Sequence, residues 1–138
     1  MQEYYSRHPR FYHAVDCIIF GFSGGELSLL LLKRKFDPGK GEWSLMGGFV
    51  QEGESMDNAA KRVLAELTGL TNVYMEQVGS FGEVDRDPGE RVISTAYYAL
   101  INININNYDR QLVEEHNAYW VKIDEVPTLL FDHQQMVD

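Results

Sequence analysis

The stretch that decides the fold is Gly47-Gly48-Phe49-Val50-Gln51-Glu52-Gly53-Glu54, followed after seven residues by Arg62-Val63-Leu64-Ala65-Glu66-Leu67-Thr68-Gly69-Leu70. Ser55 is a good helix N-cap, and Gly69 is suited to end a helix in a left-handed turn, so the sequence predicts a helix from Met56 to about Thr68. Alanine, valine and leucine recur within it at helical spacing, which predicts an apolar stripe packed on a sheet. We interpret the stretch as a glycine loop that lets backbone approach a ligand and then enters this helix.

Such a loop and helix would suit a diphosphate with Mg²⁺. Carboxylates spaced i, i+3 and i+4 on the helix would coordinate a hard cation, which polarises phosphorus and activates water. In this chain those positions are Val63, Glu66 and Leu67, of which only Glu66 is acidic. Aliphatic side chains offer no oxygen to Mg²⁺, so Val63 and Leu67 are predicted to pack on the sheet. Arg62 and Glu66 are predicted to form a helix-surface ion pair worth about 0.2 to 0.5 kcal/mol, with a structural role in orienting the loop at Glu54.

These residues resemble the Nudix box, Gly-x5-Glu-x7-Arg-Glu-U-x-Glu-Glu-x-Gly-U, where U is aliphatic. The resemblance lies over Gly48, Glu54, Arg62, Val63, Leu64, Glu66, Leu67, Gly69 and Leu70, with the spacing kept throughout. It departs at Val63, where the family has a metal-binding glutamate, and at Leu67, where the family has the glutamate most central to metal binding and catalysis. The resemblance implies an α/β Nudix fold, with a mixed sheet sandwiched between helices (α/β/α), and an ancestral hydrolysis of nucleoside diphosphates linked to another moiety.

Other parts of the chain look like ADP-ribose pyrophosphatases and, more closely, Nudix-related transcriptional regulators; these parts are residues 11–34, 81–88, 91–100 and 131–133. In the regulators, a Nudix-like domain binds a small effector, dimerises, and precedes a winged helix-turn-helix domain that binds operator DNA. The resemblance therefore implies that residues 1–138 are the effector domain of a bacterial regulator. It would be a homodimer sensing ADP-ribose or a pentose sugar, catalytically impaired and without a cofactor, and it would reach operator DNA only through a further C-terminal domain beyond residue 138.

Composition limits the classes of protein to which the chain can belong. Its 138 residues are 44% hydrophobic and 24% charged, as in an ordinary globular domain. A formal charge of -9 does not suit the chain to binding the phosphate backbone of a nucleic acid. Cys17 is the single cysteine, so it forms no internal disulfide, and a reducing compartment is expected. No apolar run is long enough to span a membrane, so we expect a cytoplasmic protein with no membrane partner.

The pattern of apolar residues outside the box predicts two strands, over 14–22 and 26–35, that pair as a hairpin. A short apolar segment follows over 43–45, and no helix is expected before Glu54. A second hairpin is predicted from 72–84 and 91–105, joined by an acidic turn, and a last strand over 118–123. The alternation of isoleucine and asparagine over 101–106 predicts an exposed strand end. A second helix is predicted from Leu129 onward.

The candidate ligand-binding residues are polar or aromatic groups near these turns: Arg34, Trp43, Gly47, Gly48, Glu83, Arg86 and Asp87. We expect the charged ones, with Glu54, to meet at one rim of the sheet, because a polyhydroxylated ligand needs convergent donors and acceptors. Turn chemistry alone also explains residues 85–90. For Trp43 the simpler interpretation is a core residue, although a tryptophan near a glycine loop could stack on a sugar or a base. Two rival functions stay open: an active ADP-ribose-type hydrolase using Mg²⁺ held by Glu54, Glu66 and Glu83, and an interaction domain with no small ligand.

Overall fold

The longest helix, α2 (Met56–Thr68), begins and ends where the sequence predicts. The Ser55 side chain accepts a hydrogen bond from the backbone N–H of Asn58 at 3.1 Å. Gly69 has a φ of +80°, and its N–H donates to the carbonyl of Ala65. These contacts come from a computed structural model that describes residues 2–35, 40–84, 86–87, 89–103, 112–127, 129 and 136–137. Both caps satisfy backbone groups that a helix end otherwise leaves unpaired.

In the part of the chain that the structure describes, a mixed seven-stranded sheet forms the centre of the molecule. Its main path runs β3-β2-β1-β6-β5, with β4 paired to β1 and β7 paired to β2. β1 and β6 are parallel over their full length, and the other pairs are antiparallel. The strands are β1 (Tyr12–Ser23), β2 (Glu26–Lys33), β3 (Trp43–Ser44), β4 (Met46–Phe49), β5 (Glu76–Phe81), β6 (Val92–Asn102) and β7 (Ala118–Lys122).

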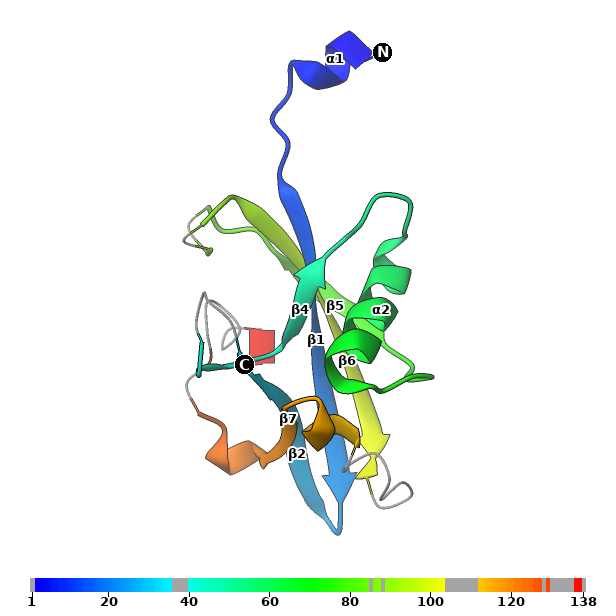
Figure 1. Ribbon diagram of the computed structural model, residues 1–138, viewed down its shortest axis with the longest axis vertical. Coiled ribbons are helices and arrows are strands. Elements are labelled where there is room, and N and C mark those ends of the chain that lie inside the picture. The colour runs from blue at the N-terminus through cyan, green and yellow to red at the C-terminus, as the bar shows by residue number, and fades with distance from the viewer. Residues whose placement is uncertain are drawn as a thin grey trace.

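Alternate residues of β1 point to opposite faces of this sheet and enter two apolar clusters. Val15, Cys17 and Ile19 join the cluster that contains the buried side of α2, which packs across the sheet (Figure 1). Ile18 lies in the other cluster, which includes Leu129 and Met136 from the C-terminal part of the chain. The sheet is therefore covered with apolar side chains on both faces, as the α/β expectation requires. Within the described part of the chain, no helix is long and apolar enough to cross a membrane.

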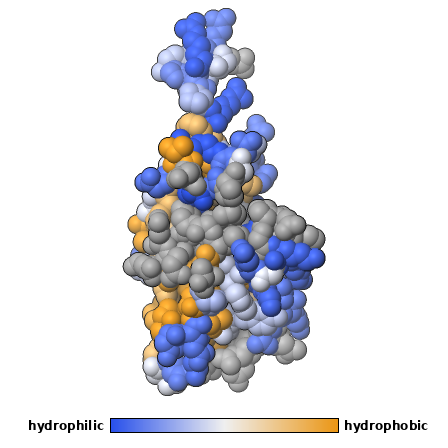
Figure 2. Space-filling view, turned by 90° about the vertical axis from the view of Figure 1, so that its left-hand side faces the viewer, coloured by the Kyte–Doolittle hydropathy of each residue, from blue (hydrophilic) through white to orange (hydrophobic). Residues whose placement is uncertain are grey.

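Several details differ from the sequence-based expectations. A short helix, α1 (Gln2–Ser6), precedes Glu54, and the segment that carries it stands clear of the body in both views (Figures 1 and 2). Gly47 and Gly48 lie within strand β4 and not in a loop, because β4 hydrogen-bonds to β1. β6 ends at Asn102. Ile103, which was expected to continue an exposed strand, is buried.

Two expectations fall largely outside the described residues. The alternation predicted over 101–106 can be followed only to Ile103, and of the helix predicted from Leu129 onward only Leu129, Met136 and Val137 are described. The chain after β7 continues through a single 3-10 turn, η2 (Ile123–Glu125), where the predicted strand was expected to include Ile123.

Candidate functional site

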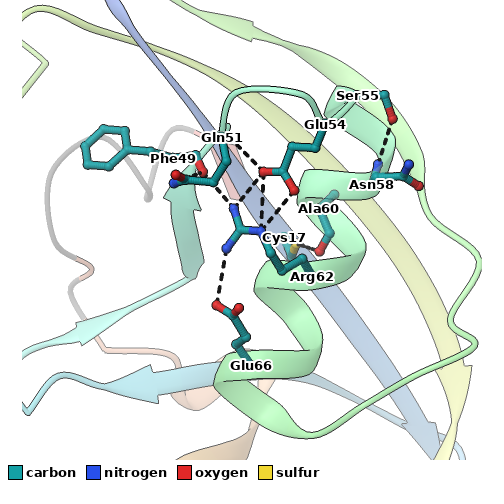
Figure 3. A network of polar contacts seen from close by, with 9 residues as sticks. All are labelled: Cys17, Phe49, Gln51, Glu54, Ser55, Asn58, Ala60, Arg62 and Glu66. Atoms are coloured by element: carbon teal, nitrogen blue, oxygen red, sulfur yellow. Dashed lines mark hydrogen bonds and ion pairs between the residues drawn. The ribbon is translucent and has the colours of Figure 1, made fainter.

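The Arg62 guanidinium on α2 joins the helix to the segment that follows β4 (Figure 3). Its Nε and Nη2 donate to the Glu54 carboxylate at 3.0 and 2.8 Å. Nη2 also donates to the carbonyl of Phe49 at 2.8 Å, and Nη1 donates to Glu66 at 3.2 Å. Glu54 in turn accepts from the backbone N–H of Gln51 at 2.8 Å. Arg62 thus ties the loop over 49–54 to the helix, and Glu66 pairs with Arg62 on the helix surface.

The opposite charges of Arg62 and Glu54 favour the contact between the helix and the loop. The hydrogen bonds from Arg62, then the N–H of Gln51, lower the pKa of Glu54 below its usual 4.5. The hydrogen bond to Glu54 raises the pKa of Arg62. Both groups therefore stay ionised at neutral pH, and each charge stabilises the other.

Val63 and Leu67, at the two positions where Nudix enzymes carry metal-binding glutamates, face away from this network. Val63 is 2% exposed, and Leu67 packs against the same apolar cluster. A side-chain carbon at Gly48 would lie 2.8 Å from a Val63 methyl, so β4 passes directly over Val63. The remaining carboxylates of the box, Glu54 and Glu66, are both paired with Arg62. These residues do not fit a Mg²⁺ site, because Val63 and Leu67 offer the cation no oxygen ligands.

A second polar cluster lies on the opposite face of the sheet. Asp16, in the middle of β1, is 3% exposed and accepts a hydrogen bond from Ser94 at 2.5 Å. Arg86, between β5 and β6, places Nη2 3.9 Å from Asp16 Oδ2. Gly47 pairs with Asp16 across the β1–β4 ladder, and a side-chain carbon there would collide with Oδ1 of Asp16. Internal packing thus accounts for the absence of side chains at Gly47 and Gly48, and their approach to a ligand stays a prediction.

The other candidate residues have separate environments. The backbone of Arg34 hydrogen-bonds to Glu42 and Gly41, at the hairpin between β2 and β3. Trp43 is half-buried, packs against the cluster that contains Leu129, and meets the Tyr119 ring edge-on at 5.8 Å. Asp87 accepts from the backbone N–H of Gly89, which is a local turn. Glu83 is exposed.

The structure thus brings some of the predicted residues together and separates others. Glu54, Arg62 and Glu66 form one cluster, whereas Arg86 joins Asp16, a residue that the sequence analysis missed. The signal that could have revealed it is a single carboxylate inside the buried run 14–22, since a buried charge requires a partner. That one rim gathers Arg34, Glu54, Glu83, Arg86 and Asp87 stays a prediction.

A separate hollow of about 500 Å³ lies between α2 and residues 70–75. At its edge the Tyr97 hydroxyl donates to Asp57 at 2.7 Å and accepts from Gln77 at 2.9 Å. Burial, then the hydrogen bond to Asp57, raises the pKa of Tyr97 to about 12. Lys61 also lines this hollow, one residue from Arg62 but outside the network that ties the loop.

A model of the NUDIX domain matches residues 10–138. The chain belongs to the NUDIX domain family. It is 35% identical over 136 residues to the ADPR responsive transcriptional repressor NtrR of Acinetobacter baylyi, covering 96% of this chain and 54% of that protein. It is 34% identical over 110 residues to the ADP-ribose pyrophosphatase of Methanocaldococcus jannaschii, covering 79% of this chain and 63% of that one.

Among solved structures, the NUDIX domain of Shewanella oneidensis NrtR, complexed with ADP ribose, superposes with a TM-score of 0.80 at 28% identity. The match covers 99% of this chain and 93% of that domain. The present chain spans little more than half of the repressor and under two thirds of the pyrophosphatase. The domain is therefore related both to a transcriptional repressor and to ADP-ribose pyrophosphatases, and its fold is the α/β Nudix fold that the box implied.

Proposed function

We propose that this NUDIX domain binds ADP-ribose as an effector, hydrolyses it poorly or not at all, and serves as the sensing domain of a bacterial transcriptional regulator. The observation that carries the proposal is that the Nudix box keeps its loop-ordering residues but has aliphatic residues at two metal-ligand positions. Arg62, Glu54 and the Phe49 carbonyl hold the loop against the helix. At the positions where metal ligands would stand, Val63 is buried in the core and Leu67 packs against it. The relationship to the repressor and to a domain complexed with ADP ribose supports the choice of effector.

The proposal extends to the protein's setting. The regulator would be cytoplasmic and dimeric, and a further domain outside residues 1–138 would contact operator DNA, since the charge of -9 does not suit this domain to that task. The effector domain would need no metal of its own. A free pentose is the alternative effector, because ADP-ribose itself ends in a pentose.

Calorimetric titration with ADP-ribose, with and without MgCl₂, tests the proposal, together with chromatography of the same mixtures for AMP. We expect saturable binding that does not need Mg²⁺ and negligible release of AMP. Titration with ribose and other pentoses separates the two effectors. The similarity to an ADP-ribose pyrophosphatase favours hydrolysis as the second candidate function. Robust Mg²⁺-dependent AMP release that is abolished by Glu66→Gln would establish that function instead.

A further inference from the structure

The hollow of about 500 Å³ between α2 and residues 70–75 has the features of a small-molecule site. Its floor is apolar, since Leu64 and Leu70, which line it, are almost fully buried in the core. A few polar groups surround this floor, and such a combination in a hollow of this size is typical of ligand pockets. They belong to Asp57, Lys61, Thr71, Asn72 and Tyr97.

The segment over 70–75, which forms one wall of the hollow, is held against the body of the domain. The Thr68 hydroxyl at the end of α2 accepts a hydrogen bond from the N–H of Leu70 at 3.1 Å. Met75, at the other end of the segment, packs against the core cluster under the helix. Between them Asn72 has a φ of +59°, a left-handed conformation that asparagine adopts more readily than most residues. The wall is therefore fixed at both ends before any ligand arrives.

Two opposite charges on α2 lie at this hollow without pairing. Asp57 and Lys61 are one helical turn apart, in the order that favours an ion pair between them. Asp57 instead accepts a hydrogen bond from the Tyr97 hydroxyl at 2.7 Å, and Gln77 donates to that hydroxyl at 2.9 Å. Among the described residues the Lys61 ammonium has no ion pair. The hollow thus has a carboxylate anchored by tyrosine and, one turn along, an ammonium that a ligand can neutralise.

We propose that this hollow is a second binding site, which takes a zwitterionic amino acid with a large apolar side chain. Asp57 accepts from the ammonium group of the ligand, Lys61 donates to its carboxylate, and its side chain lies on the apolar floor. Side chains one helical turn apart are about 5 to 6 Å from each other at Cβ, so a ligand with a single charge would meet a like charge as well as its partner. A zwitterion satisfies both groups.

A tyrosine ring at the same hollow favours an aromatic ligand. Tyr74 lines the hollow with its side chain 79% exposed, and its hydroxyl donates to Glu76 at 3.0 Å. Aromatic rings gain contact energy when they pack edge-on or offset against each other. Phenylalanine is therefore the probe, with two matched analogues: 3-phenylpropionate lacks the ammonium group, and 2-phenylethylamine lacks the carboxylate.

The test is calorimetric titration of these three compounds into the wild type, Asp57→Asn and Lys61→Gln. The wild type should bind phenylalanine about tenfold more tightly than either analogue, a difference of about 1.4 kcal/mol. Asp57→Asn, whose amide oxygen can still accept from Tyr97, should lose the preference over 3-phenylpropionate and keep the preference over 2-phenylethylamine. Lys61→Gln should do the reverse. The controls are Glu26→Gln and Lys122→Gln, which remove the same charges from an exposed pair at 3.4 Å and should keep both preferences.

NMR of methyl-labelled methionine locates the bound ligand. Phenylalanine should shift the methyl signal of Met75, which lines the hollow, and leave that of Met136, in the cluster on the other face of the sheet. No saturable binding of phenylalanine, equal affinity for the three compounds, or binding that leaves Met75 unshifted would each overturn the inference. The site does not depend on the proposed function, because a domain that binds phenylalanine here and fails to bind ADP-ribose would contradict only the latter.

Discussion

The two sides of helix α2 differ in the contacts that they make. The side that faces the loop over 49–54 carries Arg62 and Glu66 in a network of charged hydrogen bonds. The side that faces the sheet carries Val63 in the apolar core and Leu67 packed against it. In the Nudix pattern both sides are rich in carboxylates, so this chain keeps the part of the box that orders the loop and has replaced the part that would bind metal.

The largest expected effect comes from placing a charge on the buried side. Val63→Glu should lower the free energy of unfolding by about 3 kcal/mol or more, because the carboxylate would enter a site that is 2% exposed, against β4. Leu67→Glu introduces the same group at a half-buried position and should cost clearly less. Urea denaturation of the two variants measures the difference.

The pair also tests whether carboxylates at positions 63 and 67 let helix α2 bind Mg²⁺. Mg²⁺ should recover part of the stability of the double variant Val63→Glu, Leu67→Glu, since three carboxylates would again stand at the ligand spacing. Equal costs for Val63→Glu and Leu67→Glu would contradict the deeper burial of Val63.

The next effect concerns the side that faces the loop. Arg62→Ala should destabilise the domain by about 1 to 3 kcal/mol, because it removes the donors to Glu54, Glu66 and the Phe49 carbonyl and leaves Glu54 without its charge partner. Lys61→Ala, its exposed neighbour on the same helix, should change stability little. Thermal denaturation compares the two, and hydrogen exchange over 49–54 should rise only in Arg62→Ala.

Sequence was a good guide to the elements with strong local signals. Helix α2 was predicted at both ends because Ser55 and Gly69 act within a few residues of the backbone groups that they satisfy. The sequence analysis placed the glycines of β4 in a loop, because the contacts that require glycine there are made by residues distant in the chain. Gly47 is required by Asp16 and Gly48 by Val63, contacts that only the folded sheet creates.

The candidate site divides in the same way. The Arg62, Glu54 and Glu66 network follows from spacing along the chain, which the sequence displays. The pairing of Arg86 with Asp16 joins residues 70 positions apart through sheet topology, and no pattern in either segment names the other. Helix α1 was missed because five residues are too few for a helical pattern to be legible.

A smaller effect is expected where the two sides meet, at Gly48. Gly48→Ala should cost about 1 to 2 kcal/mol, because the added methyl would come within 2.8 Å of a Val63 methyl. Val63→Ala removes that methyl, so the double variant should be more stable than the sum of the single costs predicts. A double-mutant cycle from urea denaturation measures this coupling, and strict additivity would mean that β4 does not rest on Val63.

The smallest effect is a dependence on pH. The pKa of Glu54 is lowered in the folded state, so its contribution to stability is complete above its unfolded pKa, near 4.5, and declines as pH falls through the lowered value. Between pH 7 and 5 the contribution should stay constant. Below about pH 4.5 the wild type should therefore lose more stability than Glu54→Gln, which has no charge there to neutralise. Glu52→Gln removes the same formal charge from the same loop and should follow the wild type. Melting temperatures of the three proteins from pH 7 to 3 make the comparison, and parallel curves for the wild type and Glu54→Gln would show that the Arg62 pair adds no stability.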